Sequence, residues 1–243
     1  MPRFFADVSS PDMESFILSG DAFNHIKVLR LRVGDELILC DGRKTDYVCV
    51  IEEISSGSCH LKKLSSAPSV GEPDLQANLF LAFSKGDKME FVIQKAVELG
   101  VHSVTAFPSR RCVSVPDAKS VEKKLVRWNK IALEAAMQCG RGIVPEVKAA
   151  ANYAQALKLA GESELSVFLY EDERDNGYKN VLSGGKYNSV SLIIGPEGGF
   201  DPDEAKQAVD SGCVSASLGP RILRCETAPI CALSALMFHT DNL

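Results

Sequence analysis

The sequence predicts an α/β protein in which a small β domain precedes a larger domain with a mostly parallel sheet. Three observations support this class. Short apolar runs separated by turn residues fill the first 64 residues, a Ser-, Pro- and Gly-rich stretch spans 65–74, and apolar runs then alternate with amphipathic segments toward the C-terminus. Closely spaced short strands are typical of a β-barrel, and strand–helix alternation is typical of a parallel sheet. We therefore expect two domains, 1–68 and 74–243.

The first domain contains three strand-like runs, at 36–40, 47–54 and 58–64. Gly paired with Asp or Ser separates them, which is a turn signal. A helix-like segment at 21–31 precedes these strands. The stretch at 65–74 is the best linker candidate of the chain, because Ser, Pro and Gly interrupt regular structure.

The second domain alternates between the two patterns. Strands are expected at 78–83, 101–107, 165–170, 190–194 and 213–218, and helices at 87–99, 120–138, 201–211 and 228–238. Gly100 follows the first helix as a stop signal, and Ser120 is a plausible N-cap of the second. Asp201 precedes Pro202, with Glu204 at the third position, which is typical of a capped helix start.

Bulk properties limit the class of protein. No run of 18 apolar residues occurs, so no segment is expected to span a bilayer, and the N-terminus does not resemble a signal peptide. We expect a cytoplasmic protein. The eight cysteines form no C-x-x-C pair and the four histidines are scattered, so no metal site is expected.

The charge distribution is uneven. The net charge is −5, yet residues 84–148 hold 12 Lys or Arg against 7 Asp or Glu, while residues 149–243 hold 7 against 13. An acidic protein can carry a basic face that attracts RNA, although ordinary solvated helix surface explains the same numbers.

Two loops are candidates for chemistry. The first is Gly195-Pro196-Glu197-Gly198-Gly199, which directly follows a predicted strand. Ligands of open α/β sheets bind at the carboxyl ends of strands, and glycines allow a backbone to approach a ligand closely. The loop matches neither a dinucleotide-binding fingerprint nor a phosphate-binding P-loop, and a tight structural turn also explains it.

The second loop, Leu218-Gly219-Pro220-Arg221-Ile222-Leu223-Arg224-Cys225-Glu226-Thr227-Ala228, lies between a strand and the last helix. Two arginines and a glutamate lie within six residues of one another. Glu226 or Thr227 alternatively caps the last helix, with both arginines at the surface. The apolar pair between the arginines argues against a purely solvent-exposed loop.

Together the two loops resemble the signature of the RsmE-type methyltransferases, which methylate N3 of a uridine in 16S ribosomal RNA with S-adenosylmethionine. The segments 25–30, 85–100, 127–128 and 135–141 extend the resemblance over essentially the whole chain. It implies a PUA-like β-barrel followed by a SPOUT methyltransferase domain whose C-terminal segment forms a trefoil knot. It also implies a homodimer through the SPOUT domain.

The resemblance also implies site residues. Those expected to hold S-adenosylmethionine are Leu169, Tyr170, Gly195, Pro196, Glu197, Gly198, Leu218, Gly219, Ile222, Leu223, Thr227 and Ala228. Apolar walls and backbone hydrogen bonds suit an adenine ring. Glu197 either accepts from a ribose hydroxyl or braces its loop.

Methylation of uracil N3 requires loss of a weakly acidic proton. Arg224 is the candidate that stabilises the developing negative charge, and Glu226 either takes the proton, orients Arg224 or only caps the helix. Arginines suit phosphate through bidentate geometry, and the candidates for RNA contacts are Arg3, Arg30, Arg110, Arg111 and Arg141. The family usually has threonine at the position of Cys225 and often has serine at the position of Cys139.

The expected function is therefore S-adenosylmethionine-dependent methylation of a uridine in 16S ribosomal RNA, within a small ribosomal subunit. Two alternatives stay open. One is a SPOUT methyltransferase acting on another base or on a ribose 2′-hydroxyl. The other is a non-catalytic RNA-binding assembly protein, which an intact pair of cofactor loops argues against.

Overall fold

The computed structural model describes residues 1–10 and 12–243. The chain divides into two compact units. Residues 1–72 and 136–144 form the first unit, and residues 73–135 and 145–243 form the second. The segment 136–144 therefore joins the first unit although it follows a large part of the second along the chain.

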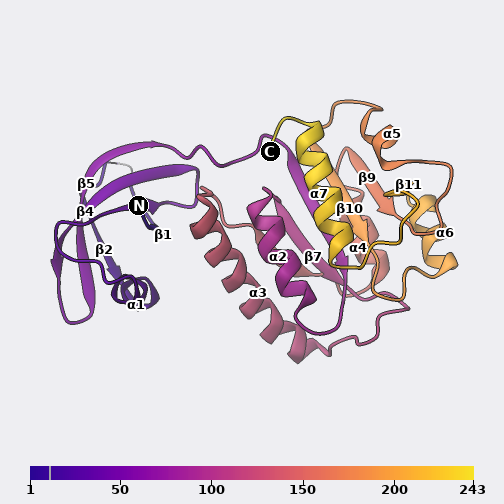
Figure 1. Cartoon of the computed structure of the whole chain (residues 1–243). Coiled ribbons are helices and arrows are strands. Elements are labelled where there is room, and N and C mark those ends of the chain that lie inside the picture. The colour runs from indigo at the N-terminus through magenta and orange to yellow at the C-terminus, as the bar shows by residue number, and fades with distance from the viewer. Residues whose placement is uncertain (11) are drawn as a thin grey trace. The chain divides into compact units, whose positions relative to one another are not determined.

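The first unit contains a curved five-stranded sheet and one helix (Figure 1). The sheet order is β1-β3-β4-β5-β2, with β1 parallel to β3 and the other neighbours antiparallel. The strands are β1 Arg3–Phe5, β2 Ser15–Ser19, β3 Glu36–Cys40, β4 Thr45–Ile54 and β5 Ser58–Pro68, and the helix is α1 Gly20–Val28. The three predicted strands and the helix are confirmed, whereas β1 and β2 were not predicted.

The core of this unit follows from alternation along its strands. Leu37 and Leu39 of β3 are fully buried, as are Cys49 of β4 and Leu61 of β5, because successive side chains of a strand point to opposite faces. The linker prediction needs a correction at its start. Residues 65–68 continue β5 and pair with β4, with Pro68 opposite Thr45 at the end of the ladder.

The second unit is built on a six-stranded sheet in which every neighbouring pair is parallel. The order is β11-β9-β10-β6-β7-β8. The strands are β6 Gln76–Ala82, β7 Ser103–Phe107, β8 Glu146–Ala149, β9 Leu165–Leu169, β10 Ser189–Ile194 and β11 Val214–Ala216. This confirms the predicted α/β class with a parallel sheet; β8 was not predicted.

Helices cover both faces of this sheet (Figure 1). They are α2 Lys88–Glu98, α3 Ala118–Cys139, α4 Tyr153–Ala160, α5 Tyr178–Leu182, α6 Pro202–Asp210 and α7 Thr227–His239. One buried cluster joins Phe80, Phe168 and Ile193 of the strands to residues of α4 and α6. Strand residues that alternate with these face the other side, where α7 packs against β6 and β10.

Local signals explain the helix ends. Asp201 accepts from the backbone N–H of Asp203, and Glu204 completes the predicted capping box of α6. Gly100 follows α2 at φ +86°, a conformation that glycine adopts without strain. The N-cap prediction for α3 was wrong. Asp117 accepts from the Ser120 backbone N–H at 2.7 Å, so the helix begins two residues earlier than predicted.

The C-terminal ends of β9, β10 and β11 lie side by side at one edge of the sheet, at Leu169, Ile194 and Ala216. Both candidate loops leave the sheet at this edge. In the described part of the chain, no helix is long and apolar enough to cross a membrane. Within the same residues, no group of three or more His, Cys, Asp or Glu side chains is arranged to hold a metal ion.

Candidate active site

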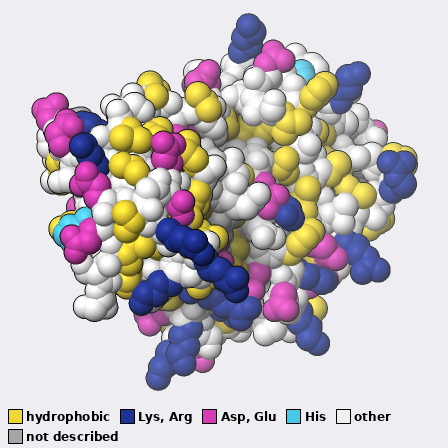
Figure 2. Space-filling view, turned by 60° about the vertical axis from the view of Figure 1, so that its left-hand side comes forward, with side chains coloured by type: hydrophobic (Ala, Val, Ile, Leu, Met, Phe, Trp, Pro, Cys, Tyr) yellow, Lys and Arg dark blue, Asp and Glu magenta, His cyan; other side chains and the backbone are white. Residues whose placement is uncertain are grey.

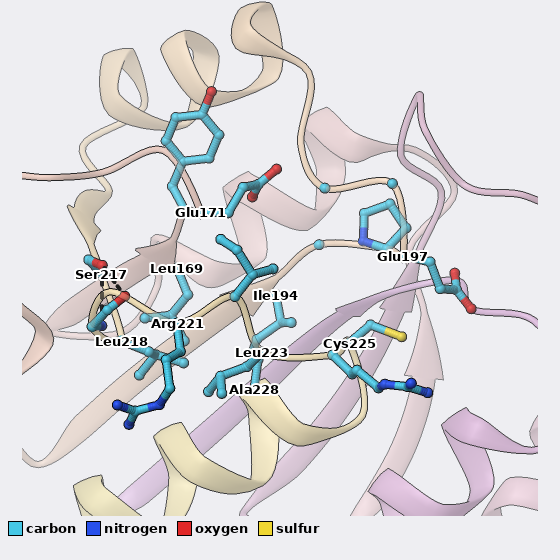
Figure 3. Close-up of a pocket in the computed structure, with 18 of the residues that line it drawn as sticks. Leu169, Glu171, Ile194, Glu197, Ser217, Leu218, Arg221, Leu223, Cys225 and Ala228 are labelled. Atoms are coloured by element: carbon cyan, nitrogen blue, oxygen red, sulfur yellow. Dashed lines mark hydrogen bonds between the residues drawn. The ribbon is translucent and has the colours of Figure 1, made fainter.

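A cavity of about 580 Å³ opens at the carboxyl ends of β9, β10 and β11 (Figure 3). Both predicted loops line it, and Lys88 and Glu171 contribute side chains from outside them. The lining residues are Lys88, Leu169, Tyr170, Glu171, Ile194, Gly195, Pro196, Glu197, Gly198, Gly199, Ala216, Ser217, Leu218, Gly219, Arg221, Ile222, Leu223, Arg224, Cys225 and Ala228. The cavity combines apolar walls with a few polar groups, as small-molecule sites do.

The first loop is tightly packed because three of its positions have no side chain. A Cβ atom on Gly195 would lie 3.0 Å from the Phe200 ring, and one on Gly198 would lie 3.0 Å from the Arg111 carbonyl oxygen. Gly199 has φ +68°, and a Cβ there would overlap the Glu171 carboxylate. The same carboxylate accepts from the Phe200 backbone N–H at 3.1 Å. A side chain at Gly195 or Gly198 would have to displace its neighbour slightly, and at Gly199 the backbone conformation itself favours glycine.

Glu197 fixes this loop to the segment before α2. Its Oε1 accepts from the Lys85 backbone N–H at 3.0 Å and from Lys88 Nζ at 3.1 Å. Desolvation opposes ionisation, but the donation from the Lys85 N–H and the Lys88 ammonium outweighs it and holds the pKa of Glu197 below its ordinary value. The sequence left two roles open for Glu197, and these contacts support the one in which it braces its loop.

The second loop has few internal contacts. Gly219, at φ +113°, donates its backbone N–H to Ser217 Oγ at 3.2 Å. From Arg221 to Cys225, no backbone N–H donates to another residue that the structure describes. Ile222 is 72% exposed, although it lies between two arginines at the cavity. The wall formed by this loop is therefore open, unlike the glycine-rich wall opposite.

Lys88 connects the two loops. Its Nζ lies 3.1 Å from Glu197 of the first loop and 3.7 Å from both Glu226 Oε2 and Cys225 Sγ of the second. Its pKa is raised, first by the hydrogen bond to Glu197. The Cys225 thiol donates to Glu226 at 3.2 Å, and burial raises the pKa of that thiol to about 11. At neutral pH this cluster therefore contains two carboxylates, one ammonium and a neutral thiol.

Glu226 occupies the N-cap position of α7, but its side chain makes no capping hydrogen bond. Its pKa is lowered, first by its own backbone N–H and then by the Cys225 thiol. Its carboxylate faces Lys88 rather than the helix end. Thr227, expected to contact the cofactor, and Glu226 itself are absent from the lining; every other predicted cofactor or catalytic residue lines the cavity.

Sequence reasoning missed Lys88, Glu171 and Ser217, and it did not name Ile194 or Ala216 of the predicted strands as site residues. Ser217 immediately precedes the second loop, and Glu171 follows Tyr170 after a strand, so extension of each predicted segment by one residue finds both. Lys88 carries no such signal, because it lies 109 residues from Glu197 along the chain.

The arginines predicted to contact RNA have different environments. Arg30 is exposed, as are Arg110 and Arg111, although Arg110 Nη1 pairs with Asp201 at 3.0 Å and Asp203 at 2.8 Å. Arg141 is only 4% exposed and forms a bidentate pair with Glu72. Arg3 binds Asp46 through both guanidinium nitrogens. The guanidinium groups of Arg3 and Arg141 are therefore occupied inside the first unit.

Comparison with known proteins finds two family models that match successive parts of the chain. A family model described as the RNA methyltransferase domain matches residues 71–237, and one described as the RNA methyltransferase PUA domain matches residues 18–64. The first match covers both loops and every residue that lines the cavity.

Curated relatives and solved structures extend this likeness to the full length. The ribosomal RNA small subunit methyltransferase E of Bacillus subtilis is 32% identical over 100% of this chain and 98% of its own length. The protein of the same name from Mesomycoplasma hyopneumoniae is 35% identical over 96% of this chain and 98% of its own.

Two solved structures bind S-adenosylmethionine. A putative methyltransferase from Legionella pneumophila has a TM-score of 0.88 and 32% identity, covering 97% of this chain and 96% of its own. The ribosomal RNA small subunit methyltransferase E from Neisseria gonorrhoeae has a TM-score of 0.86 and 29% identity, covering 98% and 97%. With its paired glycine-rich and arginine-rich loops at the carboxyl edge of a parallel sheet, the chain belongs to the ribosomal RNA small subunit methyltransferase E family.

Proposed function

We propose that this protein transfers the methyl group of S-adenosylmethionine to N3 of a uridine in 16S ribosomal RNA. The observation that carries the proposal is the cavity at the carboxyl edge of the sheet, in a chain whose full length matches small subunit methyltransferases E. The name of the family identifies small subunit ribosomal RNA as the substrate. The resemblance of both loops to RsmE-type enzymes supports N3 of uracil as the acceptor.

The residues of the cavity fit the cofactor. Leu169, Ile194 and Leu223 line the cavity and offer apolar walls for an adenine ring, and the close-packed glycine loop places backbone groups at its edge. Glu171 and Ser217 present oxygen atoms at the same cavity for hydroxyl or amino groups. When bound, the cofactor supplies an electrophilic methyl group.

The protein's own part in the reaction is to stabilise charge at the acceptor base. We assign Arg224 to the negative charge that develops on a uracil oxygen as the N3 proton leaves, because this residue lines the cavity and is exposed. Glu226 is ionised and faces Lys88. Because Glu226 does not line the cavity, we assign it the role of orienting the segment that carries Arg224.

The proposal includes the protein's partners. We infer that Arg30, Arg110 and Arg111 contact the RNA backbone, that the small ribosomal subunit is the substrate, and that the protein acts in the cytoplasm. A homodimer through the second unit is supported by exposed apolar side chains on α7 and the second loop, including Phe238 at 75% and Ile222 at 72%. The proposed homodimer is tested by measuring the molar mass of the protein in solution. The trefoil knot stays a prediction.

The test is transfer of tritiated methyl groups from S-adenosylmethionine to small subunits that lack the modification, followed by nucleoside analysis. We expect label in 3-methyluridine. The Arg224→Ala variant should lose roughly a hundredfold in kcat, since one charge-stabilising group contributes about that much, while cofactor affinity is retained. Label in another nucleoside, or an unchanged kcat in the variant, contradicts the assignment.

A further inference from the structure

We propose that a lysine stripe on the outer face of α3, formed by Lys119, Lys123 and Lys130, binds the phosphate backbone of the RNA substrate. The inference rests on the proposed function and adds to it a surface that lies outside the cavity and outside the arginines considered above.

Helix geometry places the three lysines on one face. With 3.6 residues per turn, positions 119, 123 and 130 lie within about 40° of one another around the helix axis, and they span about 16 Å along it. All three side chains are exposed. The opposite face carries Trp128 at 2% exposure and Ala132 at 0%, so the stripe points away from the core.

The three lysines outnumber the carboxylates beside them on the helix, where Glu122 follows Lys119 by three residues and Glu134 follows Lys130 by four. Across residues 1–10 and 12–243, no carboxylate lies within 4.0 Å of the ammonium group of any of the three lysines. Cations elsewhere on α3 do have partners: Arg127 pairs with Glu90 at 2.6 Å, and Lys124 Nζ lies 5.7 Å from the centre of the Trp128 ring.

The positive charge of the sequence is concentrated in one part of the chain. On the face in Figure 2, dark blue Lys and Arg side chains form a group in the lower part, and others stand singly at the top and right edges. Residues 84–148, which include α3, hold 12 Lys or Arg against 7 Asp or Glu in a chain of net charge −5. A local basic region on an acidic protein favours binding of a polyanion at that region alone.

Packing contacts join the helix that carries the stripe to the sheet that bears the site. Trp128 stacks against Phe83 with ring centroids 6.4 Å apart, and Phe83 directly follows β6. Asn129 donates to the Val147 carbonyl at 2.9 Å. The helix follows β7, whose carboxyl end lies at the sheet edge that bears the cavity, and Arg111 in the connecting loop approaches the Gly198 carbonyl at 3.5 Å. RNA bound along the stripe therefore continues toward the candidate active site.

Lysine chemistry indicates what the stripe recognises. An ammonium on a flexible stem acts as a point charge and does not require the planar, bidentate geometry of an arginine. Contacts of this kind position a nucleic acid without reading its bases. We therefore assign to the stripe a role in affinity and salt dependence, and none in the choice of nucleotide.

The experiment compares two triple variants with the same change in charge. The stripe variant is Lys119→Gln, Lys123→Gln and Lys130→Gln. The control is Lys158→Gln, Lys179→Gln and Lys206→Gln, three lysines that are also exposed and belong to the same unit. For both variants and the parent, the Kd for unmodified small subunits is measured between about 50 and 300 mM salt, together with the Kd for S-adenosylmethionine.

We expect the stripe variant to bind small subunits roughly tenfold more weakly, with a salt slope shallower by about 2, because each lost phosphate contact removes about 0.7 from the slope. The control should stay within about twofold of the parent. Cofactor affinity should be unchanged in both. Replacing the same three lysines by arginine should preserve RNA binding.

Equal losses in the stripe and control variants would overturn the inference, because net charge alone would then explain them. An unchanged salt slope in the stripe variant would also overturn it. Failure of the parent to bind S-adenosylmethionine or to transfer methyl groups would contradict the proposed function instead, since RNA binding by the stripe is measured without the cofactor.

Discussion

The two walls of the cavity differ in how many contacts hold them in place. The Gly195–Gly199 loop is held by Phe200, Arg111 and Glu171, and its Glu197 is hydrogen-bonded to Lys85 and Lys88. The loop from Leu218 to Cys225 has few hydrogen bonds and exposes Ile222 at the cavity. One wall is held by contacts within the protein, and the other presents exposed apolar and cationic side chains at the cavity.

This difference indicates that the two walls have different roles in binding. A preorganised wall loses little entropy when the cofactor binds, so it contributes to affinity. An open wall that carries Arg221 and Arg224 can also face a second ligand, the acceptor base. Lys88 links the walls through Glu197 and Glu226, so changes on either side test whether the two are coupled.

The largest effect is expected from a side chain added to the rigid wall. Gly199→Ala introduces strain at φ +68° and displaces the Glu171 carboxylate from the Phe200 N–H. Unfolding free energy should fall by about 2–4 kcal/mol, from backbone strain and a lost hydrogen bond. Cofactor affinity should fall roughly a hundredfold, which corresponds to similar energies. Thermal unfolding and titration calorimetry measure both.

Gly212→Ala is the matched control for this change. Gly212 has φ +89°, and a Cβ there meets no atom within 4 Å, so the variant carries backbone strain alone. It should be destabilised by about 1–2 kcal/mol and bind the cofactor normally. Equal cofactor affinities in the two alanine variants would show that the packing of the first loop does not matter for binding.

The next effect tests the link between the walls. Lys88→Met keeps the stem of the side chain and removes the ammonium that Glu197 and Glu226 share. We expect roughly tenfold weaker cofactor binding, since a partly buried ion pair contributes about 1 kcal/mol and a neighbouring carboxylate is left unpaired. Lys95→Met is the control, because Lys95 pairs with Glu98 at 2.7 Å on the same helix outside the cavity. Equal cofactor affinities in the Lys88→Met and Lys95→Met variants would mean that the link between the two walls does not contribute to cofactor binding.

A smaller effect is expected on the open wall. Ile222→Ser removes an apolar side chain that is 72% exposed, so the unfolding free energy should change by less than about 0.5 kcal/mol. If the cofactor covers this residue, affinity should fall about fivefold, the loss expected for partial burial of an isoleucine. Val209→Ser on α6 provides the control at an exposed position, and cofactor titration distinguishes the two. Unchanged affinity in Ile222→Ser would place the cofactor away from this wall.

The smallest effect concerns the pH dependence of the rigid wall. The pKa of Glu197 lies below its ordinary value, so its contribution to stability is present above the ordinary pKa and is lost as pH falls through the folded-state pKa. The difference in unfolding free energy between the parent and Glu197→Gln should be constant from pH 7 to about 5.5 and should shrink below about 4.5. A difference that grows on acidification would contradict the assigned direction of the shift.

The helices and strands show which secondary structure can be predicted from local sequence. The predicted strands and helices are confirmed wherever a long apolar pattern or a strong cap is present, as at the capping box of Asp201 and Glu204. Short elements were missed, namely the edge strands β1, β2 and β8 and the helices α4 and α5. β1 has three residues and β8 has four, too few for a periodic pattern, and they form because neighbouring strands supply hydrogen-bond partners.

The sequence by itself determined the α/β class, the two loops and nearly all the residues that line the cavity, because those residues lie together on strand ends that local periodicity reveals. Only the tertiary structure decided the role of Lys88 and the pairing of Arg141 with Glu72. These groups lie far apart along the chain, 109 residues for Lys88 and Glu197 and 69 for Arg141 and Glu72, and packing alone brings them together. Burial and charge compensation are properties of the folded neighbourhood, so the same residue type is exposed in one place, as at Arg30, and pairs with a buried carboxylate in another, as at Arg141.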